Sequence, residues 1–116
     1  MNYNEDKFKI ISCIKKFILD SEKLFENVPE KDLFNREYFK ECEINVLLLV
    51  YTATLTANEK DKKAVQTQII ARLSIIDFLL ERAYTKKYIT EKKLHNYSKR
   101  LAEIIKMIED WMKSSE

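Results

Sequence analysis

The chain has 116 residues, no glycine and a single proline. A protein of this length ordinarily holds about 8 glycines, which serve left-handed turns, two-residue hairpins and loops that approach a phosphate closely. The absence of glycine excludes the P-loop, the dinucleotide-binding fingerprint and the glycine-framed serine elbow. It also disfavours an architecture with many tight β-turns. The fold class that remains is all-α, with long helices and short connections.

Apolar residues recur at helical spacing in four segments, at about residues 4–25, 33–57, 61–84 and 91–113. Pro29 lies in a polar stretch between the first two segments, Asn58 begins a second polar turn, and Thr90 is placed to cap the fourth helix. The length fits one domain over residues 1–116. We therefore expect an antiparallel, up-down-up-down four-helix bundle.

The second and third helices carry apolar residues on two sides, whereas a helix of a lone bundle needs only one buried stripe. The extra stripe indicates self-association or an obligate partner, unless it consists of scattered surface hydrophobics, which are normal. Periodicity alone does not decide which stripe faces the core. The candidate oligomer interface consists of Ile44, Leu48, Tyr51, Leu55, Ala71, Ile75, Phe78 and Leu79.

The net charge of +2 conceals a basic segment, because residues 82–100 hold seven Lys and Arg against Glu91 alone. Tyr84, Tyr88 and Tyr97 are interleaved with these cations, a composition typical of phosphate contacts and base stacking. Solvated lysines with tyrosines that plug the bundle end, or pairing with the acidic first connection, explain the pattern equally well. The candidate nucleic-acid contacts are Arg72, Arg82, Lys86, Lys87, Lys92, Lys93, Lys99 and Arg100.

The sequence contains few sets of residues at spacings typical of catalytic or metal sites. His95 is the only histidine; Glu91 precedes it by four positions rather than in the Glu-x-x-His spacing of di-iron bundles, and Arg82 lies too far upstream for a helical-nuclease motif. We therefore expect no enzyme, no metal site and no cofactor. A degenerate nuclease would depend on His95 alone. The alternative of an acid–base pair at Glu37 and Glu41 is weaker than a solvated helix face.

Several features indicate a cytoplasmic protein. Cys13 and Cys42 fall in different predicted helices and suit a reduced pair. The first residues contain acids before any apolar run, unlike a signal peptide. The longest uncharged stretch, residues 44–58, is too short to span a bilayer, so we expect no membrane contact.

The order of short motifs along the chain resembles the accessory variability determinant proteins of diversity-generating retroelements, within the broader four-helix family that includes the 23S rRNA intervening-sequence proteins. The resemblance covers about residues 8–114. The shared features are a Val-Pro link after the first helix, an Arg-Glu and a Phe-Lys pair opening the second, a cysteine, a threonine cap and a late tryptophan. In this chain they are Val28, Pro29, Arg36, Glu37, Phe39, Lys40, Cys42, Thr90 and Trp111.

The resemblance implies a non-catalytic subunit that assembles into a homo-oligomeric, pentameric barrel. It further implies binding of the element's reverse transcriptase and of template RNA or an RNA/DNA hybrid, in support of mutagenic cDNA synthesis and retrohoming. Relatives are usually more basic, with several arginines on the third helix, where this chain has Arg72 and Arg82. The alternative function is a protein-interaction adaptor that binds no nucleic acid.

Overall fold

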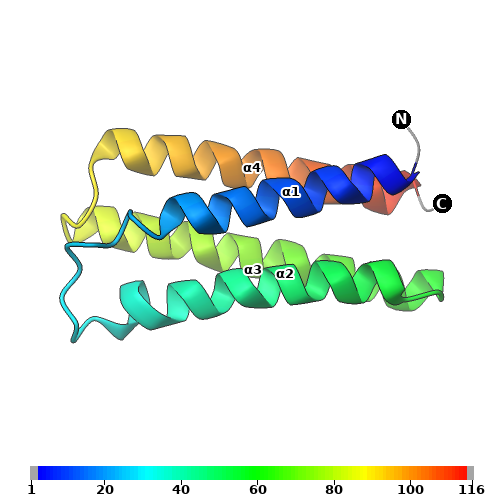
Figure 1. Ribbon diagram of the computed structural model, residues 1–116, viewed down its shortest axis with the longest axis horizontal. Helices are drawn as coiled ribbons and strands as arrows, with labels where there is room; N and C mark the ends of the chain where they lie inside the picture. Colours follow the sequence, from blue (N-terminus) through cyan, green and yellow to red (C-terminus); the bar gives the residue numbers. More distant parts are fainter. Residues whose placement is uncertain (1–2, 115–116) are drawn as a thin grey trace.

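The computed structural model describes residues 3–114, with side chains from Lys9 onward. Four long helices follow one another along the chain, and a short π-helical turn opens the second. Each helix runs opposite to the next, so the connections alternate between the two ends of an elongated bundle (Figure 1). The helices are α1 (Tyr3–Ser21), η1 (Phe34–Tyr38) with α2 (Phe39–Leu55), α3 (Glu59–Thr85) and α4 (Glu91–Ser114).

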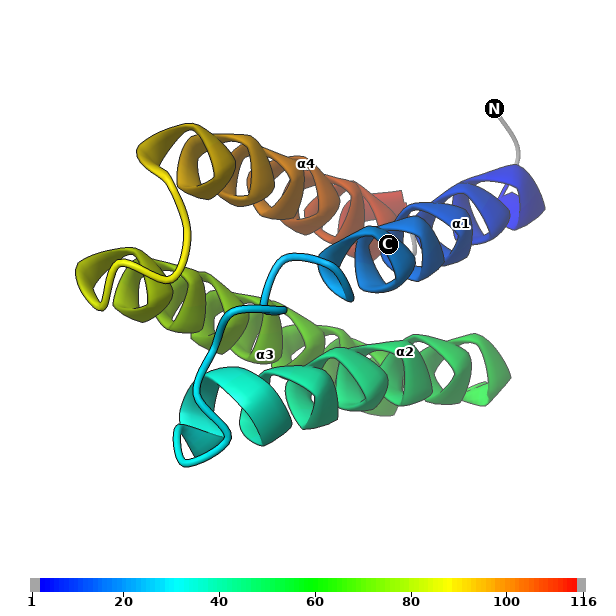
Figure 2. The same ribbon diagram turned by 60° about the vertical axis from the view of Figure 1, so that its left-hand side comes forward.

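The bundle has two layers, with α1 and α4 in one and α2 and α3 in the other (Figures 1 and 2). Each helix packs against its two neighbours around the bundle, and α2 with α3 forms the most extensive pair. The molecule measures 43 × 24 × 19 Å. This arrangement confirms the predicted all-α class and the four-helix bundle.

The core settles which stripes face inward. Val46, Val50 and Ala53 of α2 are fully buried, as are Ile69 and Leu80 of α3. From α4, the stripe predicted at helical spacing is buried through most of its length, and Trp111 joins it. The remaining core residues come from all four helices and from the connections that precede α2 and α4: Ile10, Ile14, Phe17, Leu24, Phe25, Val28, Phe39, Leu73, Ile76, Leu79, Ala83, Ile89, Leu101, Ile104 and Ile108.

Several helix boundaries differ from the sequence prediction. The first helix ends at Ser21 rather than near residue 25, yet Leu24 and Phe25 are buried because the irregular chain that follows folds back onto the core. The second helix is entered through η1, whose backbone is wider than an α-helix. Its expected last turn stops at Leu55 instead of residue 57.

Side chains cap the starts of α3 and α4, and of these two caps the sequence predicted the one at Thr90. The Asn58 side chain accepts a hydrogen bond from the Asp61 backbone N–H at 3.0 Å, and Thr90 Oγ1 accepts from the Lys93 N–H at 3.2 Å. Such side chains satisfy backbone donors that have no partner in the first turn of a helix. The third helix therefore begins at Glu59, two residues earlier than predicted, and α4 begins at Glu91 as expected.

Candidate interaction surfaces

An uncovered apolar surface lies on the layer formed by α2 and α3. Of the eleven large hydrophobic side chains found exposed among the described residues, ten fall between Leu33 and Tyr84, and only Leu19 lies elsewhere. Exposed patches of this kind mark interaction sites. We call the surface formed by seven of the eight predicted interface residues the outer face: Ile44, Leu48, Tyr51, Leu55, Ala71, Ile75 and Phe78.

The eighth predicted interface residue is misplaced. Leu79 is only 2% exposed and belongs to the core, next to Leu80. The sequence pattern put Leu79 with Phe78 on the outer face, but η1 packs beside it: the buried Asn35 side chain of η1 donates to the Leu79 carbonyl at 2.8 Å. Tyr38, the last residue of η1, is 45% exposed.

Four of the eight predicted nucleic-acid contacts form one exposed group at a single end of the bundle. We call Lys86, Lys87, Lys92 and Lys93 the basic end; all four are exposed, around the link from α3 to α4. Lys99 is exposed about two turns further along α4. The first connection lies at the same end of the molecule (Figure 1).

The other three arginines are differently placed. Arg82 binds Asp32 of the first connection at 2.8 Å, and Arg100 binds Asp20 of α1 at 3.1 Å. Arg72 is exposed near α2, where its charge opposes the rise that burial causes in the pKa of Cys42. The structure therefore does not bring Arg72 to the basic end, and two arginines are engaged within the fold.

Arg82 belongs to a polar network that joins the two connections at this end. Its Nη1 donates to both oxygens of Asp32 and to Asn35 Oδ1, and the Tyr88 hydroxyl donates to Asp32 Oδ2 at 2.6 Å. Burial alone would raise the pKa of Asp32, but hydrogen bonds from Tyr88 and Arg82 outweigh it and lower the pKa. The acidic first connection thus pairs with the basic segment inside one chain.

Arg100 has a similar structural role on α4. Its guanidinium lies 5.2 Å from the centre of the Phe17 ring and 5.3 Å from that of Tyr97. The Tyr97 ring packs edge-on against Phe17, and its hydroxyl donates to the Asp20 carbonyl at 3.1 Å. Tyr97 therefore joins α4 to α1 instead of standing free for stacking, and Tyr88 is likewise held by Asp32.

The link after α3 contains the one positive φ angle of the described residues, 66° at Lys87. The Lys87 N–H donates to the Tyr84 carbonyl, and the Tyr88 N–H donates to the Ala83 carbonyl. These two bonds form a Schellman motif, whose left-handed position is ordinarily glycine. In this glycine-free chain a lysine occupies it, which costs about 1 kcal/mol relative to glycine and places a cation at the basic end.

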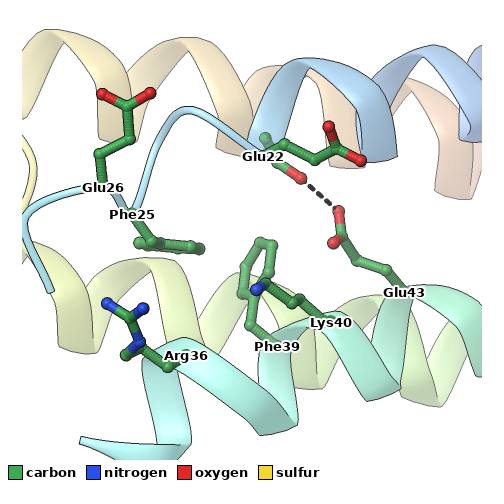
Figure 3. A pocket seen from close by; sticks show the side chains of 8 residues that line it. Glu22, Phe25, Glu26, Arg36, Phe39, Lys40 and Glu43 are labelled. Carbon is green, nitrogen blue, oxygen red and sulfur yellow. Dashed lines mark hydrogen bonds between the residues drawn. The ribbon is translucent and has the colours of Figure 1, made fainter. Parts of the chain in front are cut away.

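A hollow of about 330 Å³ lies between the end of α1 and the start of α2 (Figure 3). Glu43 on its wall is only 4% exposed, and its Oε2 lies 2.6 Å from Ser21 Oγ. Ser21 Oγ is also 2.9 Å from the Ile18 carbonyl. The Ser21 hydroxyl is the donor in both contacts, to the Ile18 carbonyl and to Glu43 Oε2.

The protonation of Glu43 follows from its surroundings. Burial raises its pKa to about 8, and the nearby Glu22 adds to the rise, whereas the Ser21 hydrogen bond and Lys40 oppose it. Sequence reasoning passed over Glu43, although an acid within the buried register of Phe39, Val46 and Val50 was a usable signal. It also passed over the exposed Leu33 and Phe34.

The residues considered for catalysis and redox chemistry lie apart from any assembled site. His95 is exposed on α4, and Glu37 and Glu41 are exposed at the start of the second helix. Cys13 and Cys42 are free thiols, each half-buried. Among the side chains that the structure describes, no three His, Cys, Asp or Glu residues are grouped to hold a metal ion. No helix within residues 3–114 is long and apolar enough to cross a membrane.

No family model matches the sequence, and searches of curated proteins and of solved structures return no significant match. The structure itself defines a four-helix bundle with a buried core, an uncovered outer face and a basic end. The resemblance to the accessory variability determinant proteins therefore rests on the sequence motifs alone.

Proposed function

We propose that this chain is a non-catalytic adaptor that self-associates through the outer face and presents its basic end to nucleic acid. In this proposal it serves as the accessory protein of a diversity-generating retroelement, bringing the reverse transcriptase and its template RNA together. The observation that carries the proposal is the uncovered apolar layer of α2 and α3. Exposed apolar surfaces of this kind mark sites at which a protein contacts another subunit or partner.

The exposure values support burial of the outer face in an assembly. Leu48 is 59% exposed and Phe78 55%, and Leu55 at the end of α2 is 86% exposed. Burying a side chain of this size contributes about 1.5–3 kcal/mol, so several such residues from each subunit suffice to drive association. Soluble homo-oligomers usually close by point-group symmetry, and the resemblance favours a ring of five subunits.

The basic end gives the assembly its second surface. Its four lysines are exposed, and none makes an ion pair in the part of the chain that the structure describes. A symmetric oligomer repeats this group in every subunit, which strengthens the field that attracts phosphates and lets one RNA engage several subunits. An adaptor of this kind needs neither cofactor nor catalytic residue.

Self-association is tested by Leu48→Glu and Phe78→Glu, each of which places a charge on the outer face. We expect both variants to yield smaller species than the wild type in light scattering. Leu19→Glu is the matched control, because Leu19 is also exposed but lies on α1, outside the outer face. A wild type that is monomeric at tens of micromolar would overturn this half of the proposal.

Nucleic-acid binding is tested by replacing the four lysines of the basic end with glutamate. We expect loss of binding to single-stranded RNA with the oligomer intact. The control changes four exposed lysines elsewhere, Lys9, Lys15, Lys60 and Lys106, by the same total charge. Binding by the wild type should weaken steeply with salt, since each phosphate contact contributes about 0.7 to the logarithmic slope for single strands. Equal loss in both variants contradicts the assignment.

The retroelement context has its own tests. A reverse-transcriptase gene and a template repeat beside the gene for this chain are expected, and the purified reverse transcriptase should bind the oligomer. The second candidate function is an adaptor that binds proteins alone. It is favoured by the engagement of Arg82 and Arg100 inside the fold, and it predicts a stable oligomer with no salt-dependent retention on RNA.

A further inference from the structure

Two exposed aromatic rings lie beside the basic end, and neither was singled out from the sequence. The π-helical turn η1 places Phe34 and Tyr38 with ring centres 5.3 Å apart at an angle of 70°. Phe34 is 52% exposed. The tyrosines expected to stack on bases are instead engaged, Tyr88 by Asp32 and Tyr97 by Phe17 and Asp20. Among the described residues, the exposed aromatic rings near this end of the bundle are Phe34, Tyr38 and Tyr84.

The position of Phe34 is fixed by its neighbours. The Arg82 guanidinium lies 5.0 Å from the centre of the Phe34 ring, and Asp32 and Asn35 hold that guanidinium in place. Asn35 is fully buried and anchors η1 to the Leu79 carbonyl. A ring held by such contacts loses little freedom when a flat ligand stacks on it.

Phe34 and Tyr38 line an open pocket of about 490 Å³ together with Lys31, Arg82 and Tyr88. The two segments that meet here, residues 29–38 and 82–88, contain five cations and three acids, and one of those acids, Asp32, is already paired with Arg82. Lys86, the residue that directly follows α3, donates its backbone N–H to the Arg82 carbonyl at 2.9 Å and so lies one turn beyond Arg82. Aromatic rings flanked by cations suit an unpaired base with phosphates on both sides.

We propose that this pocket holds an unpaired base of single-stranded RNA, stacked on one ring of the Phe34–Tyr38 pair with its edge against the other, and with the adjoining phosphates at Lys31 and Lys86. This inference rests on the proposed function, because it assumes that the basic end binds RNA. It restricts the RNA at this site to a single strand. Duplex RNA presents its phosphates but keeps its bases stacked on one another.

The test compares two RNA strands of equal length and charge, oligouridylate and the same strand with abasic positions. We expect the wild type to bind the abasic strand on the order of 10-fold more weakly, because stacking is lost while phosphates remain. The double variant Phe34→Leu/Tyr38→Leu keeps apolar volume and removes the rings. It should bind oligouridylate as weakly as the wild type binds the abasic strand, with an unchanged salt slope.

Tyr84→Leu is the matched control, because Tyr84 is exposed near the same link but does not line the pocket, so its affinity should equal that of the wild type. Quenching of a 2-aminopurine base in a wild-type complex gives a second readout that needs no variant. Equal wild-type affinity for both strands, or a changed oligomer size in the double variant, overturns the stacking site alone. Failure of every strand to bind also removes the RNA-binding part of the proposed function.

Discussion

Arg82 Nη1 contacts both carboxylate oxygens of Asp32, at 2.8 and 2.9 Å, across a sequence separation of 50 positions. The bond ties the irregular first connection to the last turn of α3, and Tyr88 reinforces it from the following link. An arginine that looked like an RNA contact in the sequence therefore has a defined structural role. The structural role of Arg82 and its predicted RNA contact can be tested separately, because fold stability and RNA affinity are measured independently.

Replacing Asp32 with alanine should lower the free energy of unfolding by about 2 kcal/mol, because Arg82 and Asn35 lose a largely buried partner. Urea unfolding followed by circular dichroism measures the loss. The control is Glu30→Ala, which removes an exposed acid two residues away and should have little effect. An equal loss in both variants would show that general charge, not the Arg82 contact, matters.

The lowered pKa of Asp32 also sets a pH dependence of stability. A carboxyl whose pKa is lower in the folded protein stabilises the fold above its ordinary pKa of 3.8, and this stabilisation disappears as the pH falls through the lower folded value. The Asp32→Ala variant should therefore differ from the wild type at pH 6 and converge with it in strong acid.

Glu43 predicts the opposite pH dependence. Its pKa of about 8 lies above the ordinary 4.5, so its contribution is complete below pH 4.5 and is lost as the pH rises toward 8. Between pH 5 and pH 9 the wild type should lose on the order of 3 kcal/mol relative to Glu43→Gln, which stays neutral. Urea titrations at several pH values measure this difference.

The control for Glu43 is Glu26→Gln, an exposed acid that lines the same hollow. Its stability should follow the wild-type dependence on pH, because the buried carboxyl is still present. A constant difference between Glu43→Gln and the wild type across this range would mean that Glu43 is already ionised in the folded protein.

Lys87→Gly should raise stability by about 1 kcal/mol, since glycine takes the left-handed conformation without a steric cost. Lys86→Gly is a matched control with the same loss of charge, but at an ordinary right-handed φ of −81°, where glycine should not stabilise. Thermal unfolding distinguishes the two. Both variants should weaken RNA binding to a similar extent if the basic end contacts phosphates.

Gln66 is fully buried in α3, and both polar atoms of its side chain lack a hydrogen-bond partner. Replacing it with methionine should stabilise the fold by about 1–2 kcal/mol, because an unsatisfied buried amide is destabilising. Gln68→Met, at an exposed position on the same helix, should change stability little. Destabilisation by Gln66→Met would indicate that the amide is satisfied in solution by bound water.

The sequence predicted the helices well because helical spacing is a local property. The cap at Thr90 and the core stripe through Ile69 and Leu80 follow from residues within a few turns of each other. Periodicity also identified two apolar sides on α2 and α3, but their assignment to core or surface depended on which helices are neighbours. That choice needs contacts between distant segments.

The errors share this cause. Leu79 is buried because η1 packs beside it, with the Asn35 side chain bonded to the Leu79 carbonyl. Pairing of Arg82 with Asp32 was equally invisible to local spacing. The sequence therefore predicted the composition of the basic segment, whereas the tertiary fold determines which of its cations remain available.

Lys87 is the one described residue whose backbone adopts the left-handed region. Every residue of the chain, Lys87 included, carries a Cβ atom, because the sequence contains no glycine. The consequence concerns the unfolded chain as much as the folded one. Without glycine, every residue samples a narrower range of backbone angles before folding, so less conformational entropy is lost when the helices form. A subunit with unsatisfied buried groups such as Gln66 gains from this restriction a stability that its contacts alone do not reveal.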